Sequence, residues 1–227
     1  MIKVGNKHYE SGLDLPVSVP VFPLSGALLL PGAQLPLNIF EPRYVQMIDE
    51  SLASDRLIGI IQPSVDAGVE QASDQVNDLC TMGCLGRIVG YGETGDGRYM
   101  MTLGGVCRFR ITGEVDPGAN LFRRCTIEPL LSDLESSDDG QEVNRELLLS
   151  NFRAYLEVNN LEVDWKSVEK ASNVLLVNSL SMMAPYGPAE KQALLEAADI
   201  RTRADTLIAI TEMVLAKDDS GGKWRLQ

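Results

Sequence analysis

Residues 34–53 read QLPLNIFEPRYVQMIDESLA, a short apolar run broken by proline that leads directly into a helical pattern. The run Gln34–Phe40 is typical of a strand. Pro42 suits the first position of a helix, where a backbone amide has no intrahelical partner to lose. Three side chains then recur at four-residue spacing, Tyr44, Ile48 and Leu52. We therefore predict an amphipathic helix over Glu41–Ala53 that packs on a sheet.

Similar apolar runs, many of them β-branched and separated by Gly and Pro, extend from residue 17 to residue 130. Such runs are typical of strands. Besides Gln34–Phe40, we predict strands at Val17–Pro23, Leu57–Gln62, Gly83–Tyr91, Arg98–Leu103, Cys107–Glu114 and Phe122–Leu130. Several short strands with a single helix favour a barrel-like or highly twisted sheet.

The pattern changes after an acidic stretch, SDLESSDDGQ at residues 132–141, which we interpret as a solvated linker. Beyond it, apolar residues follow helical spacing. Helices are predicted around 148–159, 165–183, 188–196 and 207–215. The fold class is therefore α+β, a β domain followed by an all-helical bundle subdomain. The predicted parts are an N-terminal segment 1–16, the β domain 17–131, the linker 132–141, the helical subdomain 142–217 and a tail 218–227.

Composition excludes several classes of function. The chain has 227 residues, with 20 Lys and Arg against 32 Asp and Glu, and a formal net charge of −12, which disfavours binding to a phosphate backbone. His8 is the only histidine, so most imidazole chemistry is excluded. The sequence shows neither the apolar stretch of a signal peptide nor a membrane span, so we expect a cytoplasmic protein that does not contact a membrane.

Four cysteines, at positions 80, 84, 107 and 125, are compatible with the cytosol, where reduced thiols behave as small buried apolar groups. A zinc site is the alternative interpretation. Metal motifs usually pair their ligands as C-x-x-C, whereas three residues separate Cys80 from Cys84 and no second close pair follows. We therefore expect no metal site.

Several motifs together resemble the Lon protease N-terminal domain family. They are VPVFPL at 19–24, LPG at 30–32, LPL at 35–37, IFEPRY at 39–44, GCLGRI at 83–88 and GGVCRFRI at 104–111. Pro185, EKQ at 190–192 and LLE at 194–196 look like the stretch before that family's last helix. The resemblance covers residues 17 to about 215. It implies a PUA-like β domain joined to a helical subdomain, and a role in recognising polypeptide substrates.

The sequence lacks the motifs that catalysis in a full Lon protease requires. No G-K-[ST] phosphate loop is present, and the Ser-Lys protease module is missing. Residues 90–95, GYGETG, match a dinucleotide-binding spacing, but a turn and a strand follow where a helix would be needed, so we predict a β-hairpin. We expect a stand-alone, non-enzymatic domain with no catalytic residues and no cofactor, whose partner is unfolded polypeptide or another protein.

The candidate polypeptide-binding residues are Leu28, Leu29, Leu30 and Pro31, because these apolar side chains stand in a segment where a loop would be polar. The long segment Pro63–Leu79 could form a second wall. Packing of the three leucines in the barrel core is an equally open interpretation.

Two further clusters of residues have candidate roles, one structural and one in anion binding. For Phe40, Glu41, Pro42, Arg43 and Tyr44 we predict a structural role, in which the Glu41 carboxylate accepts amides at the helix start. An alternative function is RNA or small-anion binding by Arg108, Arg110, Arg123 and Arg124 on two candidate strands. Solvation or ion pairing with Glu114 and Asp116 is the favoured interpretation of these arginines.

Overall fold

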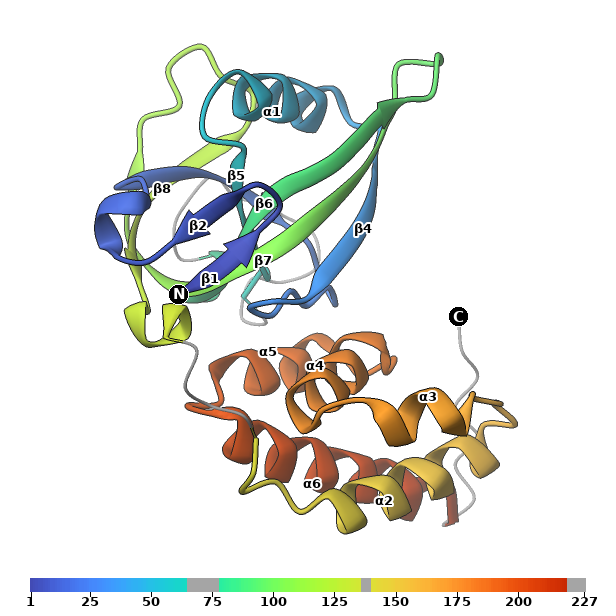
Figure 1. The fold of residues 1–227 in the computed structure, drawn as a ribbon. Helices are drawn as coiled ribbons and strands as arrows, with labels where there is room; N and C mark the ends of the chain where they lie inside the picture. Colours follow the sequence, from blue (N-terminus) through green and yellow to red (C-terminus); the bar gives the residue numbers. More distant parts are fainter. Residues whose placement is uncertain (65–77, 136–139, 220–227) are drawn as a thin grey trace. The chain divides into compact units, whose positions relative to one another are not determined.

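The computed structural model describes residues 1–64, 78–135 and 140–219, and Figure 1 shows its elements. The chain divides into two compact units. The first comprises Met1–Ser137 with Pro185–Leu195, and the second comprises Asp138–Ala184 with Glu196–Gln227. Each unit is described by itself below.

The first unit contains a closed barrel. The strands of this unit are β1 Ile2–Val4, β2 Lys7–Tyr9, β3 Ser18–Pro23, β4 Gln34–Ile39, β5 Leu57–Ile61, β6 Met82–Glu93, β7 Tyr99–Val115 and β8 Arg123–Pro129. The six-stranded sheet has the order β4-β7-β6-β5-β3-β8, and an additional β7–β8 pairing closes it. All pairings are antiparallel except β3 with β5. Val21, Leu85, Val106 and Phe109 are among the side chains that fill the interior.

Strand β7 makes the closure possible because its two halves pair with different neighbours. Residues 99–104 pair with β4, and residues 109–115 pair with β8. We predicted two strands here, Arg98–Leu103 and Cys107–Glu114, and the structure joins them through Gly104 and Gly105. Gly105 lies against the backbone of the preceding loop, since a Cβ there would be 2.0 Å from the carbonyl oxygen of Leu30. The join therefore needs glycine.

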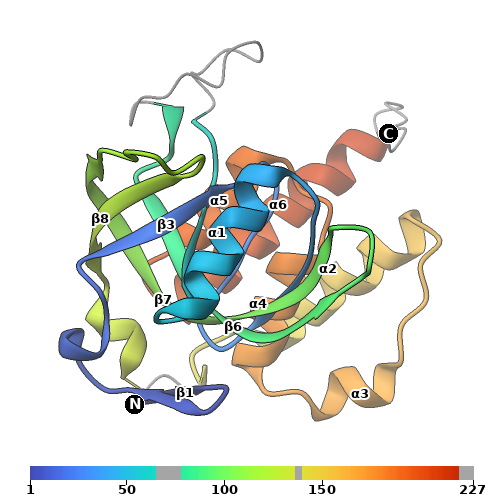
Figure 2. The same ribbon diagram turned by 90° about the horizontal axis from the view of Figure 1, so that it is seen from above.

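Beyond the barrel, β4, the first half of β7 and the second half of β6 form a three-stranded extension (Figure 1). Helix α1, Pro42–Ala53, covers one end of the barrel (Figure 2). Its Met47 and Ile48 are fully buried, and the Tyr44 ring lies 4.2 Å from that of Phe22 on β3. Apart from the two predicted strands that are joined in β7, the predicted helix and strands of this region agree with the structure to within a residue or two.

Two parts of the first unit differ from the predictions. The N-terminal segment 1–16 forms a two-stranded hairpin, β1 and β2, and a 3-10 turn, η1 Gly12–Asp14, capped by Ser11. The predicted acidic linker begins with a second 3-10 turn, η3 Leu131–Leu134, whose Leu134 is buried. Residues 136–139 of that segment lie outside the described residues, so the linker prediction is corrected only for its first residues.

Helix α5, Pro188–Glu196, groups with the barrel rather than with the other helices. The Gln62 side chain donates to the Pro188 carbonyl at 2.9 Å, and the Gln192 side chain donates to the Met82 carbonyl at 3.2 Å. The sequence-based division assigned this helix to the helical subdomain. Helical spacing alone cannot show which unit a helix joins, because side-chain bonds over more than 100 residues decide it.

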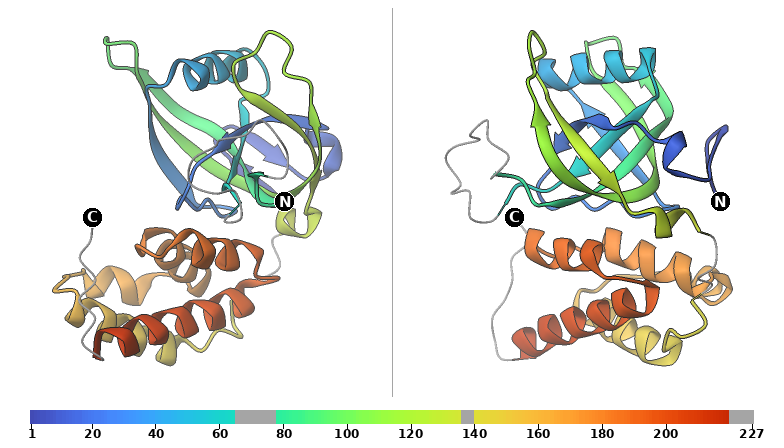
Figure 3. Two further views of the ribbon diagram at one scale, coloured as in Figure 1. Left: turned by 180° about the vertical axis from the view of Figure 1, so that it is seen from behind. Right: turned by 90° about the vertical axis from the view of Figure 1, so that its left-hand side faces the viewer.

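The described residues of the second unit form helices joined by loops, with no strand (Figure 3). Its helices are α2 Arg145–Val158, α3 Trp165–Lys170, α4 Asn173–Met183 and α6 Ile200–Asp219. Helices α2 and α6 pack side by side, and Arg203 of α6 donates to Asn178 of α4 at 3.1 Å. The predicted single helix Trp165–Met183 is wrong, because Ala171 is extended and the Ser172 hydroxyl caps α4. Of the predicted tail, 218 and 219 belong to α6 and 220–227 lie outside the described residues.

Candidate functional site

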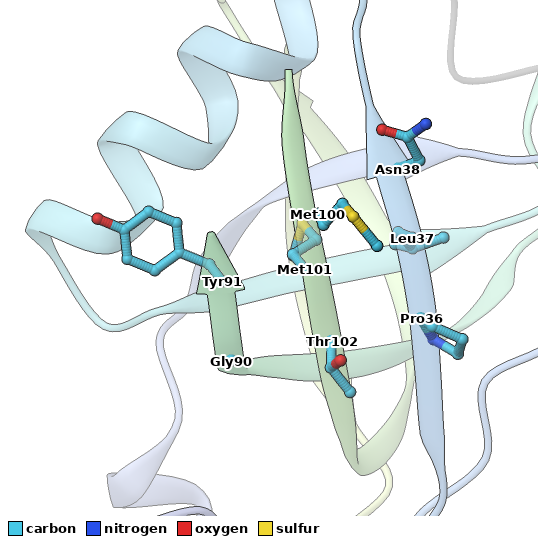
Figure 4. A pocket seen from close by; sticks show the side chains of 8 residues that line it. All are labelled: Pro36, Leu37, Asn38, Gly90, Tyr91, Met100, Met101 and Thr102. Carbon is cyan, nitrogen blue, oxygen red and sulfur yellow. The ribbon is translucent and has the colours of Figure 1, made fainter. Parts of the chain in front are cut away.

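A cavity of about 420 Å³ opens on the three-stranded extension (Figure 4). We call it the β4–β6 groove. Residues of all three strands line it: Pro36, Leu37, Asn38, Gly90, Tyr91, Met100, Met101 and Thr102. None of these side chains is carboxylic, basic, imidazole or thiol. The groove can therefore bind a ligand through apolar contact, with the Asn38 amide and the Thr102 hydroxyl as hydrogen-bonding groups.

Alternation along the strands gives the groove its shape. Met100 is 63% exposed, whereas its neighbour Met101 is 3% exposed, so the two side chains lie on opposite faces of β7. The residues of β6 opposite Met100 and Thr102 are Gly92 and Gly90, and a Cβ on either glycine would meet nothing within 4 Å. Bare backbone therefore forms part of the floor, and the Met100 side chain stands beside it.

The other face of the extension is held against α1. The Tyr99 hydroxyl donates to the Asp49 carboxylate at 2.7 Å, and this bond raises the pKa of Tyr99 to about 12. The rings of Tyr91 and Tyr99 meet edge to face with their centroids 6.0 Å apart. These contacts position the strands, and Tyr91, which also lines the groove, takes part in them.

The hairpin beyond the groove forms as the sequence predicts. Glu93 of β6 pairs with Tyr99 of β7, and between them Gly95 and Gly97 both have a φ of +82°. The match of residues 90–95 to a dinucleotide-binding spacing therefore comes from a turn that needs left-handed glycines.

The leucines predicted to bind polypeptide lie in the interior. Leu28, Leu29 and Leu30 are 3%, 1% and 0% exposed, and Pro31 is half-buried. A Cβ on Gly86 would meet the Leu29 side chain at 2.8 Å, so this side chain fills the space beside the glycine of β6. The structure thus corrects the surface interpretation in favour of core packing. Most of the proposed second wall, residues 65–77, lies outside the described residues.

The Phe40–Tyr44 cluster differs from the prediction in one respect. Glu41 is the residue before α1, but its side chain makes no cap hydrogen bond and instead accepts from Arg43 at 2.9 Å and 2.8 Å. The Arg43 guanidinium lies over the Tyr44 ring, 4.6 Å from its centroid. Phe40 is 61% exposed. Tyr44 ties the helix to β3, whereas the exposed Glu41–Arg43 pair contributes little stability.

Three of the four candidate anion-binding arginines are occupied by carboxylates. Arg108 bonds Asp133, Arg123 bonds Glu114 at 2.7 Å, and Arg124 bonds Glu50. Arg110 is exposed. The favoured interpretation, ion pairing or solvation, agrees with the structure for Arg123 with Glu114 and for Arg110, whereas the alternative of one shared anion site is corrected. Asp133 is a partner that sequence reasoning missed, because the acidic stretch around it indicates solvent exposure.

Three cysteines, Cys84, Cys107 and Cys125, and one lysine are further buried groups of the first unit. Burial raises the pKa of Cys107 to about 12 and that of Cys125 to about 11, which disfavours their nucleophilic thiolate forms. Lys191 of α5 is 2% exposed, and burial lowers its pKa to about 8. None of these residues lines the β4–β6 groove.

No group of three or more His, Cys, Asp and Glu side chains that could hold a metal ion occurs in ranges 1–64, 78–135 and 140–219. Over the same ranges, every helix is too short or too polar to cross a lipid bilayer.

Comparison with known proteins gives the family. The model of the ATP-dependent protease La (LON) substrate-binding domain matches residues 18–212. The chain belongs to this Lon substrate-binding domain family. Relatives include Lon protease 2 of Myxococcus xanthus, 25% identical over 204 residues, and the Lon protease of Parabacteroides distasonis, 29% identical over 201 residues. These alignments cover 87% and 85% of the chain but only 24% and 23% of the relatives. The chain thus spans about a quarter of their length.

Solved structures agree with the Lon fold. The N-terminal domain of a Mycobacterium avium complex Lon protease has a TM-score of 0.60 and 19% identity, and the match covers 86% of this chain and 98% of that one. A Lon N-terminal domain protein from Xanthomonas campestris has a TM-score of 0.57 and 19% identity, with coverage of 85% and 97%. The predicted α+β class, a sheet region followed by a helical region, is confirmed.

The β4–β6 groove itself was missed by sequence reasoning. Its signal was present in the alternating glycines of GYG at 90–92 and in the paired methionines 100 and 101. Periodicity places Met100 and Met101 on opposite faces of a strand, but it cannot show that the residues opposite Met100 are bare glycine backbone. That fact depends on the register between β6 and β7.

Proposed function

We propose that this chain is a non-catalytic module that binds polypeptide, either an unfolded segment or a partner protein, through the β4–β6 groove. The single observation that carries the proposal is an open apolar surface, built on Met100 and glycine backbone, in a member of the Lon substrate-binding domain family. Isolated exposed apolar residues are ordinary, whereas a hollow formed by several of them is typical of a binding surface.

The chemistry of the groove supports binding rather than catalysis. General acid-base work needs titratable groups within reach of a ligand, and the lining residues offer amide, hydroxyl, phenol and thioether groups. A methionine side chain is flexible and polarisable, so one surface adapts to ligands of different shape. Such adaptability suits a module that receives many unrelated sequences. A link to protein quality control or proteolysis is proposed from the names of the relatives.

RNA or small-anion binding has less support. The net charge is −12, and the carboxylates that occupy Arg108, Arg123 and Arg124 would have to be displaced by phosphate.

Calorimetry with reduced, carboxymethylated α-lactalbumin, a permanently unfolded protein, tests the proposal. The full chain is compared with Met100→Gln and with a matched control, Met213→Gln on α6, because the two methionines are 63% and 59% exposed. Loss of part of the apolar contact at Met100 is expected to weaken binding about fivefold, equivalent to about 1 kcal/mol. The control should stay within twofold. Absence of binding by the unmodified chain, or equal loss in both variants, contradicts the proposal.

A further inference from the structure

The outer edge of strand β4 remains open when the barrel closes. Closure pairs β7 with β8, and within ranges 1–64, 78–135 and 140–219 it leaves β4 paired only with β7, at the end of the sheet order. The residues of β4 alternate in exposure, and Gln34, Pro36 and Asn38 are the exposed set. An open edge carries unpaired backbone amides and carbonyls, which can form hydrogen bonds with the backbone of another extended chain.

The register shows which backbone groups point outward. The Gly105 amide donates to the Ala33 carbonyl at 2.8 Å, and the next pair is Gln34 with Gly104. In an antiparallel ladder, bonded and non-bonded pairs alternate, so Leu35, Leu37 and Ile39 exchange bonds with β7. Residues 34, 36 and 38 therefore direct their backbone groups away from β7. Pro36 belongs to this outward set, so its missing amide hydrogen removes no hydrogen bond between β4 and β7.

We infer that the open edge of β4 binds an extended segment of another polypeptide as an added strand. This inference rests on the proposed function and names its mode of recognition, which is backbone pairing beside the β4–β6 groove. A partner residue opposite Gln34 or Asn38 exchanges two hydrogen bonds, and its residue opposite Pro36 donates one. Backbone pairing is independent of side-chain identity, so it accepts many sequences and rejects segments with proline at the paired positions.

Pro36 also decides between another polypeptide and a second copy of this chain. When β4 pairs with β4, each of the two prolines lacks its donor, so two bonds are lost in any register that pairs both prolines. A foreign segment without proline loses only one. The penalty against self-pairing is thus twice that against another chain, and proline at a sheet edge is a common natural device against such pairing.

Two backbone variants test the added strand. Gln34→Pro removes one outward donor at the first residue of β4, a position where proline is tolerated. Its reference is Gln34→Ala, which loses the same side chain but keeps the amide. Pro36→Val supplies the missing donor. Calorimetry with carboxymethylated α-lactalbumin should show Gln34→Pro about fivefold weaker than Gln34→Ala, and Pro36→Val, at a concentration where it is monomeric, about fivefold tighter than the unmodified chain. Circular dichroism checks that each variant folds.

A peptide probe tests the same pairing without altering the protein. The probe is a ten-residue peptide of alternating Val and Thr with Lys at both ends. N-methylation of every second amide blocks one peptide edge and leaves the other free to pair, so binding should persist. N-methylation of all amides should abolish binding. In the complex, hydrogen exchange should slow at the amides of Gln34 and Asn38, while Leu37 and Ile39, already facing β7, stay unchanged.

The outcomes separate the two proposals. If the unmodified chain binds carboxymethylated α-lactalbumin but Gln34→Pro matches Gln34→Ala and the fully methylated peptide still binds, the added strand is refuted and the polypeptide-binding function stands. If the unmodified chain binds neither probe, both proposals fail. If the unmodified chain instead forms dimers that protect the Asn38 amide, the occupant is a second copy and the inference is overturned.

Discussion

Arg108 on β7 and Asp133 on η3 form a buried ion pair, with Nη2 of the arginine 2.7 Å from Oδ1 of the aspartate. The arginine Nε and its own backbone amide both donate to the other carboxylate oxygen, and Nη1 donates to the Leu195 carbonyl on α5 at 3.2 Å. One side chain thus joins a barrel strand, the turn that leaves the barrel and the helix that returns to it.

Asp133→Asn should destabilise the protein by about 3–5 kcal/mol, because it leaves the Arg108 charge buried without its counter-ion. Urea unfolding followed by circular dichroism measures the loss. Glu41→Gln is the matched control, since it breaks the exposed Glu41–Arg43 pair, and it should cost less than about 1 kcal/mol. If Asp133→Asn lowers the free energy of unfolding as little as the control does, the buried ion pair does not stabilise the fold.

Gly105→Ala should destabilise the barrel by about 1–3 kcal/mol or prevent folding, because the new methyl group would lie 2.0 Å from the Leu30 carbonyl oxygen. Gly92→Ala on β6 introduces the same group into open space and should change stability by less than about 0.5 kcal/mol. Thermal unfolding compares the two. Equal melting temperatures would mean that the loop 28–31 moves away from β7 at little cost.

Much of the first unit could be predicted from sequence because its signals are local. Pro42 and the spacing of Tyr44 and Ile48 located α1, and short apolar runs located the strands. Features that depend on contacts between distant parts of the chain could not be predicted in this way. Burial of Leu28–Leu30 depends on glycines far along the chain, and the Arg108–Asp133 pair depends on a turn inside a stretch that reads as solvated. The open β4–β6 groove depends on register, which a single sequence does not specify.

Lys191→Met should remove a pH-dependent contribution to the free energy of unfolding. Burial lowers the pKa of Lys191 from 10.5 to about 8, so below pH 8 the folded protein carries the cost of a buried charge. Between pH 8 and 10.5 the unfolded chain binds more protons than the folded one, so this lysine makes stability rise with pH.

Urea unfolding at pH 7, 8, 9 and 10 measures this contribution, because the free energy of unfolding of the unmodified chain should rise relative to that of Lys191→Met as pH increases. Lys166→Met, at an exposed position of α3, is the control and should show no such trend. A constant difference over this range would contradict the lowered pKa of Lys191.

Pro36→Val should make the chain self-associate. The substitution restores an outward amide on β4 and places a β-branched residue, which favours strands, at an open edge. When two copies of this variant pair through β4, no hydrogen bond is lost. The disadvantage of self-pairing relative to pairing with another polypeptide therefore disappears. Sedimentation velocity over about 1–100 μM should show a concentration-dependent dimer for Pro36→Val. A Pro36→Lys variant also restores the amide but adds like charge at the edge, and it should remain less associated than Pro36→Val. If Pro36→Val sediments as the unmodified chain does, proline is not what limits pairing at this edge.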